Sequence, residues 1–311
     1  MKIKILGTES LGVRGLSCVV EARERKVFID PGVALGYQRQ GLLPHPFQVA
    51  VGERVRQQIV SELKGSTDIV ISHFHGDHVP LVKANPYQLP AQQVIPYFRN
   101  ARLWCKNAHF SSPIVAKRRL DLSENLGRSL PEAEGKTDDL LSFSGAVPHG
   151  EPNKHLGMVM MTCINDRKDV FVHASDIQLL DSKPISQILD WRPDIVLTSG
   201  PPLYLRQMSA RKQERVWENA VELSRGVRTL ILDHHLLRSE EGFRFLDQIS
   251  SRTGNRVICA ADYMGRRRLP LEAWRQRLYQ EMPVAKGWHK AYAAGKADTR
   301  NYRNWRGIKI S

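Results

Sequence analysis

Cysteine is scarce in this chain: only four of its 311 residues are cysteines, and no two of them form a C-x-x-C pair. Cys18, Cys105, Cys163 and Cys259 lie far apart, and three of them fall in apolar runs that are typical of strands. This spacing argues against a disulfide scaffold and against a cysteine-based zinc site. We therefore expect buried free thiols.

The sequence also lacks an apolar run long enough to span a bilayer, and residues 1–4 do not begin a signal peptide. We expect no membrane association and a cytoplasmic location. Hydrophobic residues make up 41% and charged residues 25%, which is an ordinary globular composition. The length is sufficient for one large domain or two modest ones, and the sequence does not predict an oligomeric state.

Acidic residues are few relative to basic ones, with 32 Asp and Glu against 46 Lys and Arg, so the net charge is +14. Such an excess suggests a polyanionic partner, RNA or DNA for example. A high charge also serves solubility, so charge alone leaves that partner open.

Apolar spacing predicts several elements. Val55, Ile59 and Leu63 recur at helical spacing and predict a helix over residues 52–63, after a Gly- and Pro-punctuated insertion over residues 33–51. Further helices are expected over residues 209–225, 243–251 and 271–281, and strands over residues 2–6, 16–22, 26–30, 194–198, 227–233 and 256–260.

The most informative stretch is an apolar strand that runs directly into a cluster of polar residues. Ile69, Val70 and Ile71 predict a buried strand, and residues 73–78 (HFHGDH) then supply three histidines and one aspartate within six positions. Imidazole and carboxylate groups are ligands of zinc and of related metals, and catalytic sites keep one position open for water. The pattern therefore predicts a metal site.

This H-x-H-x-D-H pattern resembles the signature of the metallo-β-lactamase superfamily of metal-dependent hydrolases. The sequence is most similar to a branch of predicted hydrolases known mainly from archaea, through residues 30–32 (DPG), 42–46 (LLPHP), 199–202 (SGPP) and 232–236 (LDHHL). For such a branch the resemblance implies a fold and a metal site but no substrate. The implied fold is an α/β four-layer αβ/βα sandwich, which we expect to span residues 1–285.

The resemblance also implies seven ligands for two divalent metal ions. One ion would be held by His73, His75 and His149, the other by Asp77, His78 and His234, with Asp176 bridging them. Zinc is the expected metal, and iron or manganese tolerate the same ligands. Two such ions activate a water molecule for attack, and Asp77 would orient that water or accept its proton.

Four further residues have expected roles outside this ligand set. Asp30 is expected to brace the metal loop through hydrogen bonds, as the superfamily uses an aspartate at this point. His235 competes with His234 for the last ligand position; strand-end alignment favours His234, so His235 would point away or meet substrate. His45 could reach substrate, although a lone histidine is more often structural. His173 is expected to face away from Asp176 on a strand.

The sequence does not identify the substrate. The positive charge favours a phosphodiester or nucleic-acid substrate. The alternatives are hydrolysis of a small thioester, lactone or other ester, and a metal-stabilised binding protein without turnover. Residues 286–311 form a basic aromatic C-terminal tail in which Trp288, Tyr302 and Trp305 are interleaved with cations. Such a tail is suited to stacking on bases and to contact with phosphates. The alternative is that its aromatic rings pack back on the domain.

Overall fold

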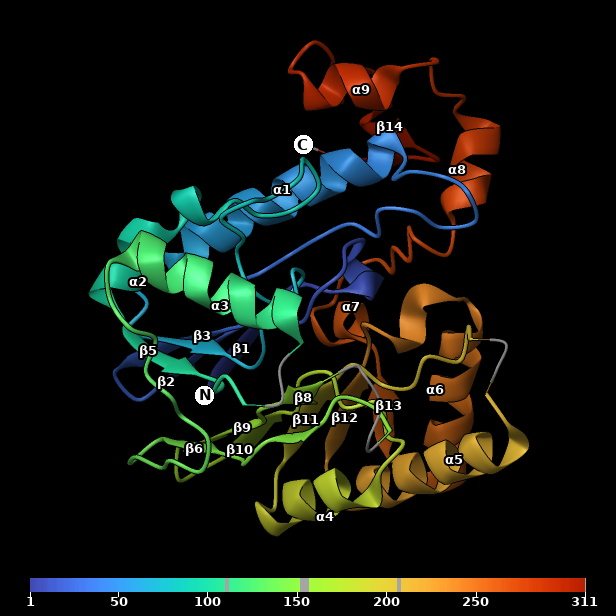
Figure 1. The fold of residues 1–311 in the computed structure, drawn as a ribbon. Helices are drawn as coiled ribbons and strands as arrows, with labels where there is room; N and C mark the ends of the chain where they lie inside the picture. The colour runs from blue at the N-terminus through green and yellow to red at the C-terminus, as the bar shows by residue number, and fades with distance from the viewer. Residues whose placement is uncertain (110–111, 152–156, 206–207, 311) are drawn as a thin grey trace.

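Two β-sheets packed between layers of helices form the body of the protein in a computed structural model, which describes residues 1–109, 112–151, 157–205 and 208–310 (Figure 1). Helices α1 (Pro46–Leu63), α2 (Ile95–Asn100) and α3 (Pro113–Leu126) cover the first sheet. Helices α4 (Ser182–Asp190), α5 (Ala210–Arg225) and α6 (Glu241–Thr253) cover the second. This layering confirms the predicted four-layer sandwich.

The first sheet has the strand order β1-β2-β3-β4-β5. Its first two pairings are antiparallel, and β3, β4 and β5 run parallel. The strands are β1 (Lys2–Gly7), β2 (Ser17–Ala22), β3 (Arg25–Ile29), β4 (Asp68–Ile71) and β5 (Arg102–Cys105).

The second sheet has the order β13-β12-β11-β10-β9-β6, parallel from β13 to β10 and antiparallel beyond. Its strands are β6 (Leu141–Phe143), β9 (Thr162–Asn165), β10 (Val170–His173), β11 (Ile195–Thr198), β12 (Thr229–Leu232) and β13 (Arg256–Ile258). A short pair, β7 (Val147–Pro148) and β8 (Met158–Val159), lies outside both sheets. The carboxyl ends of parallel strands meet at one edge of a sheet, which is where α/β folds place their sites.

Strand alternation divides the core into two clusters. Val20 and Val70 face apolar residues of the second sheet, including Phe171. The neighbouring residues Val19 and Ile69 point the other way, into a core shared with α1. Because successive side chains on a strand face opposite sides, the first sheet is buried on both faces. The four cysteines are free and buried, as the sequence predicts.

Helix α1 begins at Pro46, six residues earlier than the apolar spacing predicts. The side chain of His45 caps this helix, because its Nδ1 accepts a hydrogen bond from the Phe47 N–H at 3.1 Å. Proline is favoured at the first helical position, where no N–H is needed. Part of the expected insertion is therefore the first turns of a helix.

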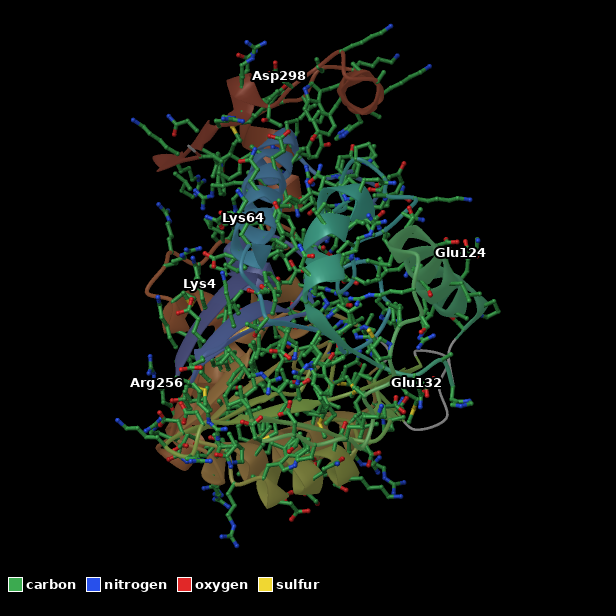
Figure 2. All side chains as sticks on the ribbon, turned by 90° about the vertical axis from the view of Figure 1, so that its left-hand side faces the viewer. Lys4, Lys64, Glu124, Glu132, Arg256 and Asp298 are labelled. Carbon is green, nitrogen blue, oxygen red and sulfur yellow. The ribbon has the colours of Figure 1, made fainter. Side chains whose placement is uncertain are left out.

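The C-terminal segment is not a free tail. It contains α8 (Arg275–Glu281), α9 (Trp288–Ala293) and the strand pair β14 (Asn304–Trp305) and β15 (Ile308–Lys309). Trp288 and Trp305 are 8% and 4% exposed and belong to the core beneath α1. In Figure 2, Asp298 of this segment lies above α1 and Lys64, which follows the helix, lies at its lower end.

The remaining elements of the described residues are short. Four 3₁₀ turns are η1 (Glu9–Leu11), η2 (Ala91–Gln93), η3 (Leu236–Arg238) and η4 (Arg300–Tyr302), and α7 covers Ala260–Tyr263. Within the described residues, no helix combines the length and the apolar character needed to cross a bilayer.

Candidate metal centre

The histidine loop leaves the carboxyl end of β4 and packs against the turn that follows β3. A side chain at Gly32 would place its Cβ 2.2 Å from the backbone nitrogen of Val79 and 2.3 Å from the carbonyl carbon of His78, so only glycine allows this approach. The Gly32 N–H donates to the His78 carbonyl oxygen at 3.0 Å. The turn and the loop are therefore held together through their backbones.

Asp176 stands at the centre of the cluster. Strand β10 ends at His173, and Ser175 adopts a left-handed backbone with φ of 53°, which turns the chain before Asp176. The distances from Asp176 Oδ2 to the Nε2 atoms of the surrounding histidines are 2.9 Å for His149, 3.1 Å for His235, 3.3 Å for His78, 3.7 Å for His73 and 3.8 Å for His234.

The donor atoms form four overlapping groups: one joins Asp176, His234 and His235, one joins Asp30, His73 and His78, and two follow the expected ligand sets. Of the last two, one contains His73, His75, His149 and Asp176, and the other contains Asp77, His78 and His234. In each group all the potential ligand atoms lie within 4.8 Å of one another. The structure thus brings together all seven residues that the sequence proposes as ligands.

Four atoms of the seven expected ligands are buried without a hydrogen-bond partner among the described residues. They are Nε2 of His73, His78 and His149, and Oδ1 of Asp176. Buried polar atoms in native proteins normally have partners, and leaving one unpaired costs about 1–3 kcal/mol. Unpaired imidazole nitrogens and a carboxylate that converge on one point fit a metal ion of the zinc class.

Burial and neighbouring charges set the protonation of these groups. Burial, assisted by the nearby His149, lowers the pKa of His75 to about 4, so His75 is neutral near pH 7, which is the form that binds metal. Burial alone would raise the pKa of Asp176, but the adjacent His78, His234 and His235 outweigh it and hold that pKa well below its usual range. The carboxylate is therefore ionised.

The outer nitrogens of the ligand rings have their own partners. Nδ1 of His78 lies 2.9 Å from Asp30 Oδ2, Nδ1 of His73 lies 3.0 Å from the Ser72 hydroxyl, and Nδ1 of His149 lies 3.3 Å from the side-chain nitrogen of Gln178. Such partners orient metal-binding imidazoles and set which nitrogen faces the metal. Asp30 thus occupies the bracing position expected from the sequence.

Relatives of this chain share nearly its whole length. A UPF0282 protein of Methanosarcina mazei is 50% identical over 302 residues, covering 97% of this chain and 99% of the relative. The chain belongs to the UPF0282 family. Another member, from Thermococcus onnurineus, is 35% identical over 90% of this chain and 95% of its own length. The prediction of a branch known from archaea is confirmed by these relatives.

Other comparisons add little to this UPF0282 assignment. No model of a known protein family matches the chain. A crystal structure of a metal-dependent hydrolase of the β-lactamase superfamily is 16% identical, with a TM-score of 0.47, covering 83% of this chain and 96% of that one. A mutant of the β-hydroxylase CmlA is 12% identical, also with a TM-score of 0.47, covering 83% of this chain and 51% of that chain.

The two adjacent histidines of this UPF0282 chain both face the centre, and Nε2 of His235 lies 3.1 Å from Asp176 Oδ2. Of the two alternatives that the sequence gave for His235, pointing away is wrong, and contact with substrate stays a prediction. Their other contacts differ. Nδ1 of His234 accepts a hydrogen bond from the Gly15 N–H at 3.2 Å, and its Nε2 lies 3.3 Å from Asp77 Oδ2. Nδ1 of His235 is buried without a partner among the described residues. Both rings can supply a ligand, and the choice of His234 stays a prediction.

A buried arginine beside the cluster was not anticipated from the sequence. A side-chain nitrogen of Arg238 lies 2.9 Å from His234 Nε2 and 3.8 Å from Asp77 Oδ2. Glu9 lies 3.3 Å from the Arg238 Nε, and burial together with Glu272 raises the pKa of Glu9 well above its usual range. Arg238 falls four residues after His234, but no local pattern marks it as part of a site.

Two histidines considered from the sequence do not join the cluster. Both ring nitrogens of the buried His45 are used elsewhere, one in the α1 cap and one 2.8 Å from the Met282 carbonyl oxygen. The ring has no free polar atom to offer, which supports the structural role that the sequence left as the alternative for His45. Nε2 of His173 lies 2.8 Å from the Leu16 carbonyl oxygen, which confirms that this histidine faces away from Asp176.

Two of the candidate ligands are partly exposed in the described part of the chain. His75 and Asp77 are partly exposed, whereas His73, His78, His149 and Asp176 are buried. A water molecule or substrate would therefore approach past Asp77 and His75. This leaves the open position that a catalytic metal site needs.

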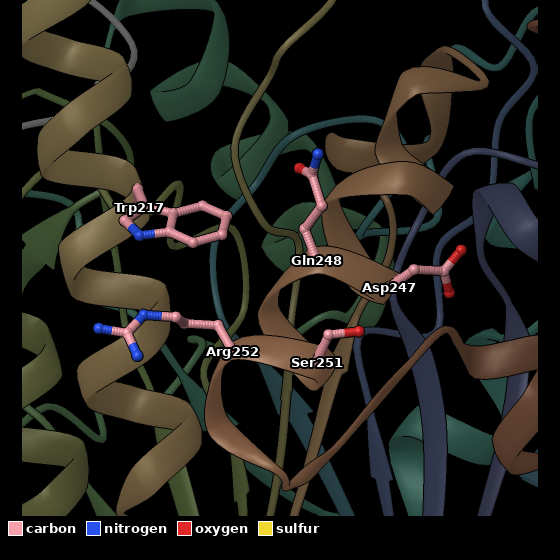
Figure 3. A pocket seen from close by; sticks show the side chains of 5 residues that line it. All are labelled: Trp217, Asp247, Gln248, Ser251 and Arg252. Atoms are coloured by element: carbon pink, nitrogen blue, oxygen red, sulfur yellow. The ribbon is translucent and has the colours of Figure 1, made fainter.

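A separate surface pocket of about 490 Å³ lies between α5 and α6. Figure 3 shows Trp217 of α5 on one side, and Gln248, Ser251 and Arg252 of α6 on the other. The fifth lining residue, Asp247, supplies its only carboxylate, and no histidine lines the pocket. The lining residues of this pocket therefore offer no set of metal ligands.

Proposed function

We propose that this chain is a metal-dependent hydrolase that uses a two-metal centre to activate water. The observation that carries the proposal is the convergence of buried, unpaired histidine nitrogens and the Asp176 carboxylate within two ligand groups. Zinc is the first candidate, with iron or manganese as alternatives that accept the same ligands. Asp176 belongs between the two groups and is the candidate bridge.

The residues of the chain have distinct roles in this proposal. Bound metal ions supply Lewis-acid chemistry and lower the pKa of a coordinated water to about 7. Asp77 is the partly exposed carboxylate at the open side, where it can orient the attacking water or take its proton. Arg238 is aimed at the same edge of the cluster, where a negative charge on substrate would be stabilised.

A phosphodiester is the substrate class that we favour, with RNA or DNA as the partner. A buried guanidinium beside the centre and a net charge of +14 both support an anionic substrate. Hydrolysis of a small thioester, lactone or other ester is the alternative, since a metal centre also polarises carbonyl groups. A binding protein without turnover would keep the metal but show neither activity.

The decisive experiment compares substrates on metal-loaded protein. Bis(p-nitrophenyl) phosphate and a single-stranded oligonucleotide test phosphodiester hydrolysis, and p-nitrophenyl acetate and an acyl thioester test the alternative. Asp77→Asn should lower turnover by about 10²–10⁴-fold. Arg225→Gln, on an exposed part of α5, is the control.

The outcomes separate the three functions. Turnover of the phosphodiesters alone supports the favoured substrate, and turnover of the esters alone replaces it. If protein that carries two metal ions shows neither activity, the remaining function is that of a metal-stabilised binding protein without turnover. Oligonucleotide binding should weaken with salt, with log K falling by about 0.7 per phosphate contact on a single strand.

A further inference from the structure

A second pocket, of about 310 Å³, lies at the edge of the first sheet beside β1. Its walls come from α1, from the segment after α7 and from the C-terminal strand β15. Leu6, Val55 and Leu269 contribute to an apolar floor. No histidine and no carboxylate side chain is among the lining residues, so the pocket is separate from the metal centre.

Four cations line this pocket. They are Arg54, Arg266, Arg267 and Lys309. None of them makes an ion pair or a side-chain hydrogen bond to another residue in the described part of the chain. Nearby arginines behave differently: Arg268 pairs with Asp262 at 2.7 Å, and Arg306 pairs with Glu281. The pocket therefore gathers cations that have no partner among the described residues, although neighbouring arginines are paired.

The pocket also holds polar atoms that are buried and unpaired. Nε of Arg54 and Oε1 of Gln58 have no hydrogen-bond partner among the described residues. Burial, together with the nearby charge of Arg266, lowers the pKa of Arg54. Like charges held together at a protein surface repel each other, and an anion placed between them removes that repulsion.

We propose that this pocket binds the phosphate group of a small anionic metabolite. Guanidinium groups match phosphate oxygens through paired hydrogen bonds, and a lysine adds a compact charge. A volume of about 310 Å³ falls in the range of small-molecule pockets, and the apolar floor can contact the rest of the molecule. The proposal does not depend on the function proposed for the metal centre.

The test measures pyrophosphate binding by isothermal titration calorimetry on the full chain. Arg54→Gln and Arg267→Gln should each weaken binding by at least about tenfold, because each removes a charge-assisted contact with the phosphate. The control Arg225→Gln lies on exposed α5 and should bind as the wild type does. The variant His75→Ala changes the metal centre and should retain binding at the pocket, which separates the two anion sites.

Thermal unfolding supplies an independent measurement. Without ligand, Arg267→Gln should unfold at or above the wild-type temperature, because the change relieves repulsion at an exposed side chain. With pyrophosphate, the wild type should gain thermal stability and this variant should not. A marked loss of stability in Arg267→Gln without ligand would overturn the proposal, since the cation would then serve the fold.

Calorimetry also distinguishes the source of the phosphate. If an oligonucleotide binds through Arg54 and Arg267 and pyrophosphate does not bind, the small-metabolite assignment is overturned in favour of a nucleic-acid surface. Absence of pyrophosphate binding in the wild type, or equal binding by the wild type and both pocket variants, would overturn the pocket as an anion site.

Discussion

The carboxylate of Asp30 lies 2.9 Å from Nδ1 of His78, on the side of the ring opposite to Asp176. The same carboxylate accepts hydrogen bonds from the backbone N–H of Ser72 at 2.8 Å and from its hydroxyl at 2.6 Å. Asp30 therefore fixes both the start of the histidine loop and the orientation of one imidazole. A carboxylate in this position also increases the basicity of the ligand.

Replacing Asp30 with asparagine should weaken the metal site without removing a ligand. We expect metal affinity to fall by about 10–100-fold, the usual effect of losing such an outer partner. Elemental analysis after dialysis against a graded chelator measures the effect. Metal retention equal to that of the wild type would show that Ser72 and the Gly32 turn hold the loop without Asp30.

Asp176→Ala should reduce metal content and activity far more than His173→Ala. Asp176 lies within 3.8 Å of five histidines, whereas His173 contacts the Leu16 carbonyl oxygen. Wild-type protein should hold two transition-metal ions per chain, and His75→Ala should hold fewer. Equal metal content in Asp176→Ala and His173→Ala would contradict the central position of Asp176.

Alanine at His234 should lower the occupancy of one metal, because its ring completes a group with Asp77 and His78. Alanine at His235 should leave both metals in place and change the rate or the substrate affinity. Metal content and kinetic constants measured side by side separate the two. If only His235→Ala loses metal, His235 is the ligand and His234 is the residue that affects rate or affinity. The hydrogen bond from the Gly15 N–H to Nδ1 of His234 would then explain why His234 is not the ligand.

His45 predicts a specific dependence of stability on pH. Burial lowers its pKa from the ordinary 6.5 to about 4. The unfolded chain therefore takes up a proton at His45 as the pH falls below about 6.5, while the folded chain does not until about pH 4. The free energy of unfolding should fall in this window, and His45→Asn should reduce the slope by up to about 1.4 kcal/mol per pH unit. Chemical denaturation between about pH 4.5 and about pH 7 measures that slope. An unchanged slope would contradict the buried neutral ring.

Trp305→Ala should destabilise the whole domain. The indole is 4% exposed, its ring centroid lies 5.8 Å from that of Phe47, and its Nε1 donates to Glu281 at 2.8 Å. Loss of a buried aromatic side chain costs about 3–5 kcal/mol. Denaturant unfolding measures the loss. Wild-type stability combined with weaker oligonucleotide binding would instead return Trp305 to the stacking role expected from the sequence.

The sequence by itself determined the features that depend on neighbouring residues. The apolar run before His73 predicted β4 and its loop, and the spacing of apolar residues predicted α5 to within one residue at its start. The H-x-H-x-D-H pattern and its resemblance supplied the fold class and seven candidate ligands, because these residues follow strands whose carboxyl ends meet. The start of α1 was missed, since its cap is a histidine and its first turns contain few polar residues.

Only the tertiary structure decided which residues surround that cluster. Glu9 lies far from Arg238 and His234 in the sequence, and no local pattern marks Glu9 or Arg238 as part of the site. The same holds for Trp305: an aromatic residue among cations looks available for stacking until packing against Phe47 buries it. Local sequence sets periodicity and ligand spacing, whereas burial and charge pairing arise from contacts between segments far apart in the chain.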